Sequence, residues 1–105
     1  MTLGTGIIPV GAISDSANDL RYDEYLVYRF LNGRAETIYI GITGTPRTRW
    51  QAHLRRQAWA REIAEIYYTA GMTKPQALNL EREAILDERP IYNRTVSHAH
   101  PLNQA

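Results

Sequence analysis

The sequence predicts a small α+β domain in which helices flank a three-stranded antiparallel sheet. Its 105 residues are enough for one compact domain and too few for two. Strand-like and helix-like patterns follow each other in the order strand, strand, helix, strand, helix. The chain has no cysteine, and no segment approaches the roughly 20 apolar residues that cross a bilayer. We therefore expect a cytoplasmic protein without disulfides, zinc–thiolate sites or membrane association.

The chain divides into three parts by composition. Residues 1–21 mix Gly, Ser, Asn and Asp with a short apolar run, Ile7-Ile8-Pro9-Val10, and are expected to form a flexible arm or an added edge segment. Residues 22–94 hold all the patterned elements and are expected to be the functional domain. Residues 95–105 are predicted to be a polar tail.

Two strands and a short turn predict an antiparallel hairpin at the start of the domain. Residues 25–30 are rich in aromatic and branched side chains, as strands are. A loop with an Asn32-Gly33 turn signal follows, and residues 37–42 then resume the strand pattern. Alternation predicts that one face of this second strand carries Ile38, Ile40 and Ile42, and the other carries Tyr39 and Gly41.

The first long helix is predicted over residues 46–56. Thr45 provides a capping side chain, and Pro46 fits the first helical position, where the missing N–H costs nothing. Trp50 and Leu54, four residues apart, are expected to face the core.

The third strand and the final helix complete the domain. Residues around 63–69 are strand-like, and Gly71 is expected to end that strand. The helix then begins at a capping box, Thr73-x-x-Gln76, and Pro90 ends it.

Glu81 interrupts the apolar face of the final helix. On a helical wheel it falls near the middle of an arc that contains Ala77, Leu78, Leu80, Ala84 and Ile85. A carboxylate in that place is costly unless a cation meets it. The cation is either an arginine of the preceding helix, in a buried ion pair, or a metal ion at the floor of a cleft.

Positive charge is concentrated in one segment although the net charge is only +1. Residues 46–61 contain five arginines and no acid, whereas residues 62–89 contain six acids and three bases. A basic stripe beside an acidic helix suits a metal-dependent nuclease, but it also fits an ordinary solvated helix face. The five arginines are Arg47, Arg49, Arg55, Arg56 and Arg61.

Five motifs occur in a fixed order along the domain: Leu26-Val27-Tyr28, Tyr39-Ile40-Gly41, Arg49 with His53, Glu81, and Pro90-x-Tyr92-Asn93. Arg49 lies eight residues after Gly41, and Glu81 lies nine residues before Pro90. In this order and spacing the sequence resembles the GIY-YIG nuclease superfamily over about residues 24–94. Leu26 stands where the family usually has glycine. This departure affects the expected shape of the hairpin more than the expected chemistry.

The resemblance implies a DNA endonuclease that uses one divalent metal ion, Mg²⁺ with Mn²⁺ as a substitute. Glu81 would hold the metal, and Arg49 would contact the phosphate that is cleaved. Tyr28 would act as general base or position the attacking water, with Tyr39 assisting, and His53 would accept a proton or contact phosphate. The nucleic-acid contacts would be Arg47, Arg49, Arg55, Arg56 and Asn93, the last of which would also secure the end of the final helix.

Other interpretations of these residues stay open at this point. Tyr28 and Tyr39 are also typical core aromatics, and Arg49 is also a typical surface charge. Trp59 either stacks on a base or packs in the core, with packing favoured. His98 and His100 form a weak candidate metal pair in the polar tail.

Three functional classes follow from the sequence. The first is a nuclease acting on duplex or branched DNA, the second a catalytically silent binding or regulatory module of the same fold, and the third a nuclease acting on RNA. Because positive charge outside the stripe is sparse, we expect a homodimer or a partner protein to supply affinity for DNA.

Overall fold

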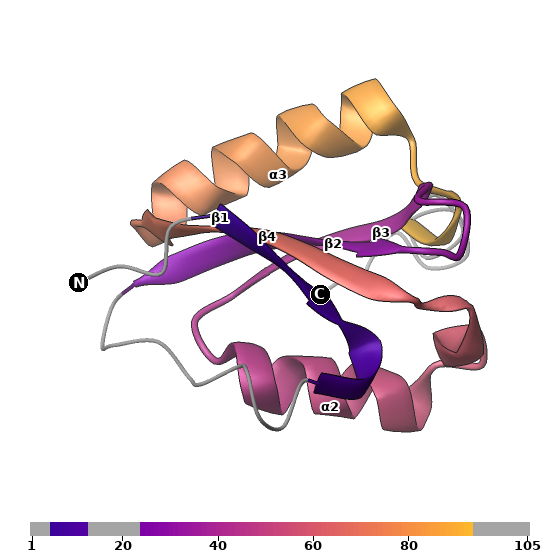
Figure 1. Cartoon of the computed structure of the whole chain (residues 1–105). Helices are drawn as coiled ribbons and strands as arrows, with labels where there is room; N and C mark the ends of the chain where they lie inside the picture. The colour runs from indigo at the N-terminus through magenta and orange to yellow at the C-terminus, as the bar shows by residue number, and fades with distance from the viewer. Residues whose placement is uncertain (1–4, 13–23, 94–105) are drawn as a thin grey trace.

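The computed structural model describes residues 5–12 and 24–93 of the chain. It has three layers, with helix α2 on one face of a four-stranded antiparallel sheet and helix α3 on the other (Figure 1). The strand order is β1-β4-β2-β3. No helix within the described ranges is long and apolar enough to cross a membrane. The elements are β1 (Thr5–Pro9), η1 (Val10–Ala12), β2 (Tyr25–Leu31), β3 (Thr37–Thr43), α2 (Pro46–Arg56), η2 (Ala60–Glu62), β4 (Glu65–Met72) and α3 (Lys74–Glu88).

The predicted α+β class is confirmed, and β1 adds a fourth strand to the three expected. β1 pairs antiparallel with β4, from Thr5 opposite Thr69 to Pro9 opposite Glu65. Ile8 is buried in the core below the sheet. The apolar run in the first segment therefore forms an edge strand, where a terminal proline is tolerated because no ladder hydrogen bond is lost.

β4 is longer than the sequence pattern predicted. Gly71 was expected to end the strand, yet the strand continues to Met72. Gly71 has a φ of 85°, and the register between β2 and β4 shifts between Tyr25 and Val27. A glycine with positive φ absorbs the extra residue of a bulge, so it bends the strand instead of terminating it.

The turn between β2 and β3 is organised by the side chain of Asn32. Its Oδ1 accepts hydrogen bonds from the backbone N–H groups of Arg34 and Glu36, at 2.9 and 3.0 Å. The left-handed residue of the turn is Ala35, with a φ of 62°. The turn signal therefore acts through the asparagine side chain.

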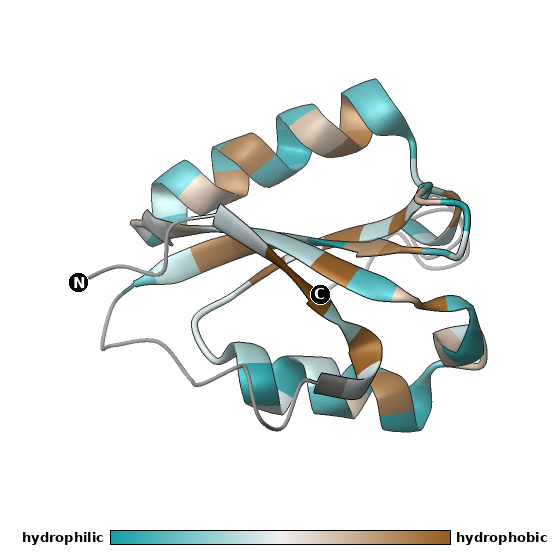
Figure 2. Cartoon of the chain, viewed as in Figure 1, coloured by the Kyte–Doolittle hydropathy of each residue, from teal (hydrophilic) through white to brown (hydrophobic). Residues whose placement is uncertain are grey.

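Two apolar cores lie on the two faces of the sheet. Figure 2 shows apolar segments of the strands between two helices in which hydrophilic and apolar residues alternate. Ile38 was expected to share the face of Ile40, but it packs in the other core, because the β2–β3 register shifts beside Leu31. The α2-side core contains Ile8, Leu26, Tyr28, Phe30, Ile38, Trp50, Ile63 and Ile66. The α3-side core contains Val27, Ile40, Ala77 and Ala84.

α2 has the predicted bounds but not the predicted cap. The side chain of Thr45 makes no capping hydrogen bond to the helix. Its backbone N–H instead donates to Oγ1 of Thr43 at 2.9 Å. The residue before the proline is thus held by the end of β3, which fixes the direction in which α2 leaves the sheet.

α3 begins at the predicted capping box. Oγ1 of Thr73 accepts from the N–H of Gln76, and the Gln76 side chain accepts from the N–H of Thr73. The helix meets the sheet through the small residues Ala77 and Ala84, which are buried. Leu78 was expected on the apolar face, but it is 41% exposed. The strip of α3 that contacts the sheet is centred on the two alanines and does not include every residue of the apolar arc of the helical wheel.

Candidate active site

Tyr28 lies in central strand β2 and is fully buried in the α2-side core. It is directly opposite Gly41 of β3. A Cβ atom built on Gly41 would lie 2.5 Å from the phenol oxygen of Tyr28 and 2.6 Å from its Cζ. The phenol ring therefore crosses the backbone of Gly41, and this position is open only because residue 41 has no side chain.

The hydroxyl group of Tyr28 is hydrogen-bonded to Nε2 of His53, at 3.0 Å. Burial, with Arg49 nearby, lowers the pKa of His53 to about 4, so the imidazole is neutral at pH 7. Burial raises the pKa of Tyr28 well above its usual range; Tyr39 and Glu81 add to the rise, and Arg49 opposes it. The phenol therefore keeps its proton at neutral pH and can donate it to Nε2. Nδ1 of His53 has no hydrogen-bond partner among the described residues.

Arg49 stands one helical turn before His53 and exposes much of its side chain. Its guanidinium lowers the pKa of both Tyr28 and Tyr39 through charge and hydrogen bonding. Burial alone would lower the pKa of Arg49, yet the two phenols raise it. The guanidinium thus faces two phenols on one side and solvent on the other, an arrangement that can receive a phosphate oxygen.

Tyr39 of β3 is half-buried, in contrast to fully buried Tyr28. Burial raises its pKa, as does the charge of Glu81, so this phenol is also protonated at neutral pH. Its ring lies 5.4 Å from that of Trp59, and Trp59 stacks on Tyr92 at 4.5 Å with an interplanar angle of 5°. Trp59 therefore packs between two rings, as the favoured interpretation predicted.

Glu81 is half-buried on the face of α3 that meets the sheet. Burial raises the pKa of its carboxyl group. In the part of the chain that the structure describes, Glu81 has no hydrogen bond or ion pair, so the expected alternative of a buried ion pair is absent there. Its charge raises the pKa of Tyr28 and Tyr39, which places the carboxylate within electrostatic reach of both phenols.

Four elements contribute groups that interact electrostatically: both phenols feel the charge of Arg49 and that of Glu81. The phenols come from β2 and β3, the guanidinium of Arg49 from α2, and the carboxylate of Glu81 from α3. A half-buried carboxylate without a cationic partner is a fitting ligand for a hard divalent cation. No group of three or more acids and histidines that could hold a metal is found within residues 5–12 and 24–93. One carboxylate suits Mg²⁺, which keeps several waters and takes other ligands from phosphate.

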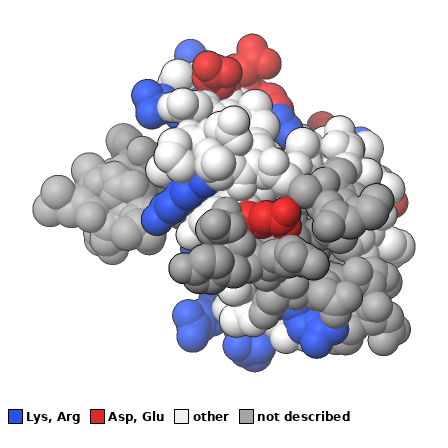
Figure 3. All heavy atoms as spheres, turned by 90° about the vertical axis from the view of Figure 1, so that its left-hand side faces the viewer, with Lys and Arg blue, Asp and Glu red and all other residues white. Residues whose placement is uncertain are grey.

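The remaining arginines of α2 lie at its two ends. Arg55 and Arg56 are exposed in the last turn, whereas Arg47 is partly buried in the first. On the face shown in Figure 3, the charged side chains below, over α2, are basic, whereas acidic and basic side chains lie together above, over α3. The helix has no acid of its own, so its outer surface is available to an anionic partner.

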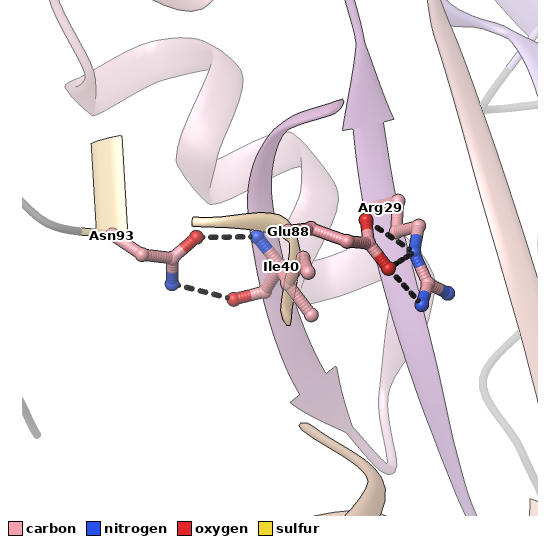
Figure 4. Close-up of polar contacts among 4 residues, drawn as sticks. All are labelled: Arg29, Ile40, Glu88 and Asn93. Atoms are coloured by element: carbon pink, nitrogen blue, oxygen red, sulfur yellow. Dashed lines mark hydrogen bonds and ion pairs between the residues drawn. The ribbon is translucent and has the colours of Figure 1, made fainter. Parts of the chain in front are cut away.

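Asn93 clamps the outer edge of the sheet (Figure 4). Its Oδ1 accepts from the N–H of Ile40 at 2.7 Å, and its Nδ2 donates to the Ile40 carbonyl at 2.9 Å. The amide thereby pairs with edge strand β3 as a neighbouring strand would. This bond holds the segment after α3 beside Tyr39, and it engages the amide that was expected to contact nucleic acid.

Two contacts in this region were not anticipated from the sequence. Arg29 of β2 binds Glu88 at the end of α3 with both Nε and one terminal nitrogen, the shortest contact being 2.7 Å (Figure 4). The hydroxyl of Tyr92 donates to Oε2 of Glu62 at 2.5 Å. Each partner is an ordinary surface residue type, and the pairs are 59 and 30 residues apart, so no local pattern indicates them. His98 and His100 lie outside the described residues.

Comparison with known proteins places the chain in a family and agrees with the fold. A model of the GIY-YIG catalytic domain matches residues 24–94. The magnesium-bound N-terminal endonuclease domain of UvrC from Thermotoga maritima is 26% identical, with a TM-score of 0.63 over 78% of this chain and 91% of that one. A point mutant of that domain, bound to its catalytic divalent cation, gives 26% identity and a TM-score of 0.64 over 78% and 90% of the two chains. No curated protein sequence matches the chain.

Proposed function

Because the chain belongs to the family of GIY-YIG catalytic domains, we propose that it is a divalent-metal-dependent endonuclease that hydrolyses phosphodiester bonds of DNA. The observation that carries the proposal is the half-buried carboxylate of Glu81. It has no cationic partner in the described part of the chain, and its charge acts on the same two phenols that Arg49 faces. A structural role would supply this carboxylate with a partner, whereas a metal ligand keeps its oxygens available.

The residues of the site divide the work of hydrolysis among them. Glu81 would hold a Mg²⁺ ion, with Mn²⁺ as a substitute; the bound metal would lower the pKa of water and stabilise the leaving oxygen. Arg49 binds the phosphate through its exposed side, where a guanidinium fork stabilises the charge that develops in the transition state. The expected products carry a 5′ phosphate and a 3′ hydroxyl group.

Burial separates the roles of the two tyrosines. Tyr28 is fully buried and its hydroxyl is bonded to His53, so it has no surface on which to meet the attacking water. Tyr39 is half-buried beside the same arginine. In our proposal the phenol of Tyr39 contacts the water. Tyr28 and His53, which lie in the core, hold the side chains of Tyr39 and Arg49 in position. Because the pKa of Tyr39 is raised, its phenol stays protonated and orients the attacking water by hydrogen bonding, and the proton that the water loses passes to solvent.

A nicking assay tests the proposal. Supercoiled plasmid is incubated with the protein in Mg²⁺ or Mn²⁺, with EDTA as the metal-free control. We expect nicking by the wild type and a loss of at least about 100-fold in Glu81→Gln, the scale of removing one group that stabilises the transition state. Glu83→Gln, an exposed acid on the same helix, is the matched control and is expected to keep full activity.

Substrate comparison separates the competing classes. Duplex DNA, branched DNA, single strands and RNA are offered under the same conditions, and preference for RNA would reassign the substrate. Binding of DNA without cleavage of any of them, in either metal, would instead indicate a silent binding module. Gel filtration with and without DNA tests the expected homodimer, which a tightly binding monomer would contradict.

A further inference from the structure

A hollow on the exposed face of α2 adjoins the proposed active site. It is lined by Arg49, Ala52, His53, Arg56 and Gln57, which follow each other at the spacing of one helix face. Two guanidinium groups and a carboxamide border it, and none of its lining residues in the described part of the chain is acidic. A concave surface with several N–H donors and net positive charge is suited to an anion.

We infer that this hollow binds the phosphate next to the one that is cleaved, with Arg56 as its principal ligand. The inference rests on the proposed function and names a second contact point for the same strand. Arg49 belongs both to the hollow and to the cluster around the two phenols. His53 also lines the hollow and is bonded to Tyr28. An anion in the hollow therefore lies directly beside the reaction centre.

The spacing along the helix fits one strand running over α2. Arg56 follows Arg49 by seven residues, or two turns, which is about 10 Å along the axis at 1.5 Å per residue. Both side chains are exposed and long enough to reach toward each other across the intervening turn. Two arginines on one face can thus hold two phosphates of one strand and set its direction across the site.

Arg55 provides a matched control within the same turn. It is exposed, carries the same charge and neighbours Arg56, but it does not line the hollow. Long-range attraction to DNA is therefore nearly the same for both residues, and only a positioned contact distinguishes them. Arg55→Gln and Arg56→Gln remove the same charge and keep a helix-compatible side chain.

The first experiment uses a DNA duplex with one mapped cleavage position. Phosphates around that position are replaced one at a time by uncharged methylphosphonates. For the wild type we expect one flanking replacement to raise KM about tenfold, the lower range for a hydrogen bond to a charged group. In Arg56→Gln this penalty disappears because the contact is already lost, whereas Arg55→Gln retains it. Equal responses of the two variants, or a penalty that persists in Arg56→Gln, would overturn the inference.

The second experiment does not depend on cleavage. The side-chain Nε–H signals of the arginines are followed by NMR while a short DNA duplex is added in Ca²⁺, in place of Mg²⁺. We expect the signals of Arg49 and Arg56 to shift together and that of Arg55 to shift less than half as far. A larger shift of Arg55 than of Arg56 contradicts the inference even if the protein cleaves DNA. The expected shifts in a protein that cleaves no substrate would support phosphate binding in the hollow and refute the proposed nuclease activity, and with it the position of that phosphate next to a cleaved one.

Discussion

Gly41→Ala is expected to damage the site by displacing Tyr28. The added Cβ would lie 2.5 Å from the phenol oxygen and 2.6 Å from Cζ, about an ångström closer than ordinary contact at 3.4 to 4 Å. Because Tyr28 is fully buried, its ring has no free space to enter, and either β3 or the ring must shift. Overpacking costs about 1–3 kcal/mol, and loss of the bond to His53 adds about 1 kcal/mol. A displacement near an ångström lowers catalysis about 100-fold.

Gly6→Ala is the matched variant for this prediction. Gly6 of β1 lies opposite Tyr68, and an added Cβ would lie 2.5 Å from the Tyr68 phenol oxygen. The steric conflict is the same, but Tyr68 is half-buried and is not part of the proposed site. Urea denaturation and plasmid nicking are measured for both variants. We expect both to lose stability and only Gly41→Ala to lose activity per folded molecule. Full activity of Gly41→Ala, or an equal loss in Gly6→Ala, would refute the reasoning.

Three further predictions concern pH, the metal ligand and the clamp. The pKa of His53 is about 4 in the folded protein and near 6.5 unfolded, so between these values the unfolded chain binds more protons. The free energy of unfolding should then fall as pH drops through this range, and it should fall more steeply for the wild type than for His53→Gln. Urea denaturation at a series of pH values measures both. Glu81→Gln removes a half-buried charge that has no cationic partner among residues 5–12 and 24–93, so calorimetry should show unchanged or slightly higher stability. A clear loss of stability would indicate that a cation balances this charge in the folded chain. Asn93→Ala uncovers the N–H and carbonyl of Ile40 and should cost about 1–2 kcal/mol in urea denaturation; no loss would contradict the clamp.

The order of the strands and α-helices from β2 to α3 could be predicted because each carries a local signal, whereas the strand β1 was left open as an arm or an edge segment. The capping box at Thr73 and the proline at the start of α2 mark helix starts, and the branched and aromatic runs mark the strands. Bulges were harder, since Gly71 is equally compatible with the end of a strand and with a kink inside it. Pairing with β4 decides between these outcomes, and pairing is a property of the folded chain.

The candidate residues of the site could also be predicted from local motifs, whereas their burial and their partners depend on contacts between distant segments. Motif spacing identified Tyr28, Arg49 and Glu81 as candidates, but it could not show that Glu81 lacks a cationic partner in the described part of the chain. Nor could it show that Tyr28 is buried behind Tyr39, because both tyrosines occupy strand positions of similar local composition. Burial depends on α2 covering this face of the sheet, which no residue near Tyr28 encodes.

The central claim is that Glu81 and Arg49 serve one metal-and-phosphate site beside the two phenols. A crystal structure of the protein with a DNA duplex and Ca²⁺, which supports binding without efficient turnover, tests it most directly. We predict a Ca²⁺ ion bound to a Glu81 carboxylate oxygen and to an oxygen of a phosphate that also contacts Arg49. A cation bound away from Glu81, or a DNA strand that passes over another face of the molecule, would contradict the claim.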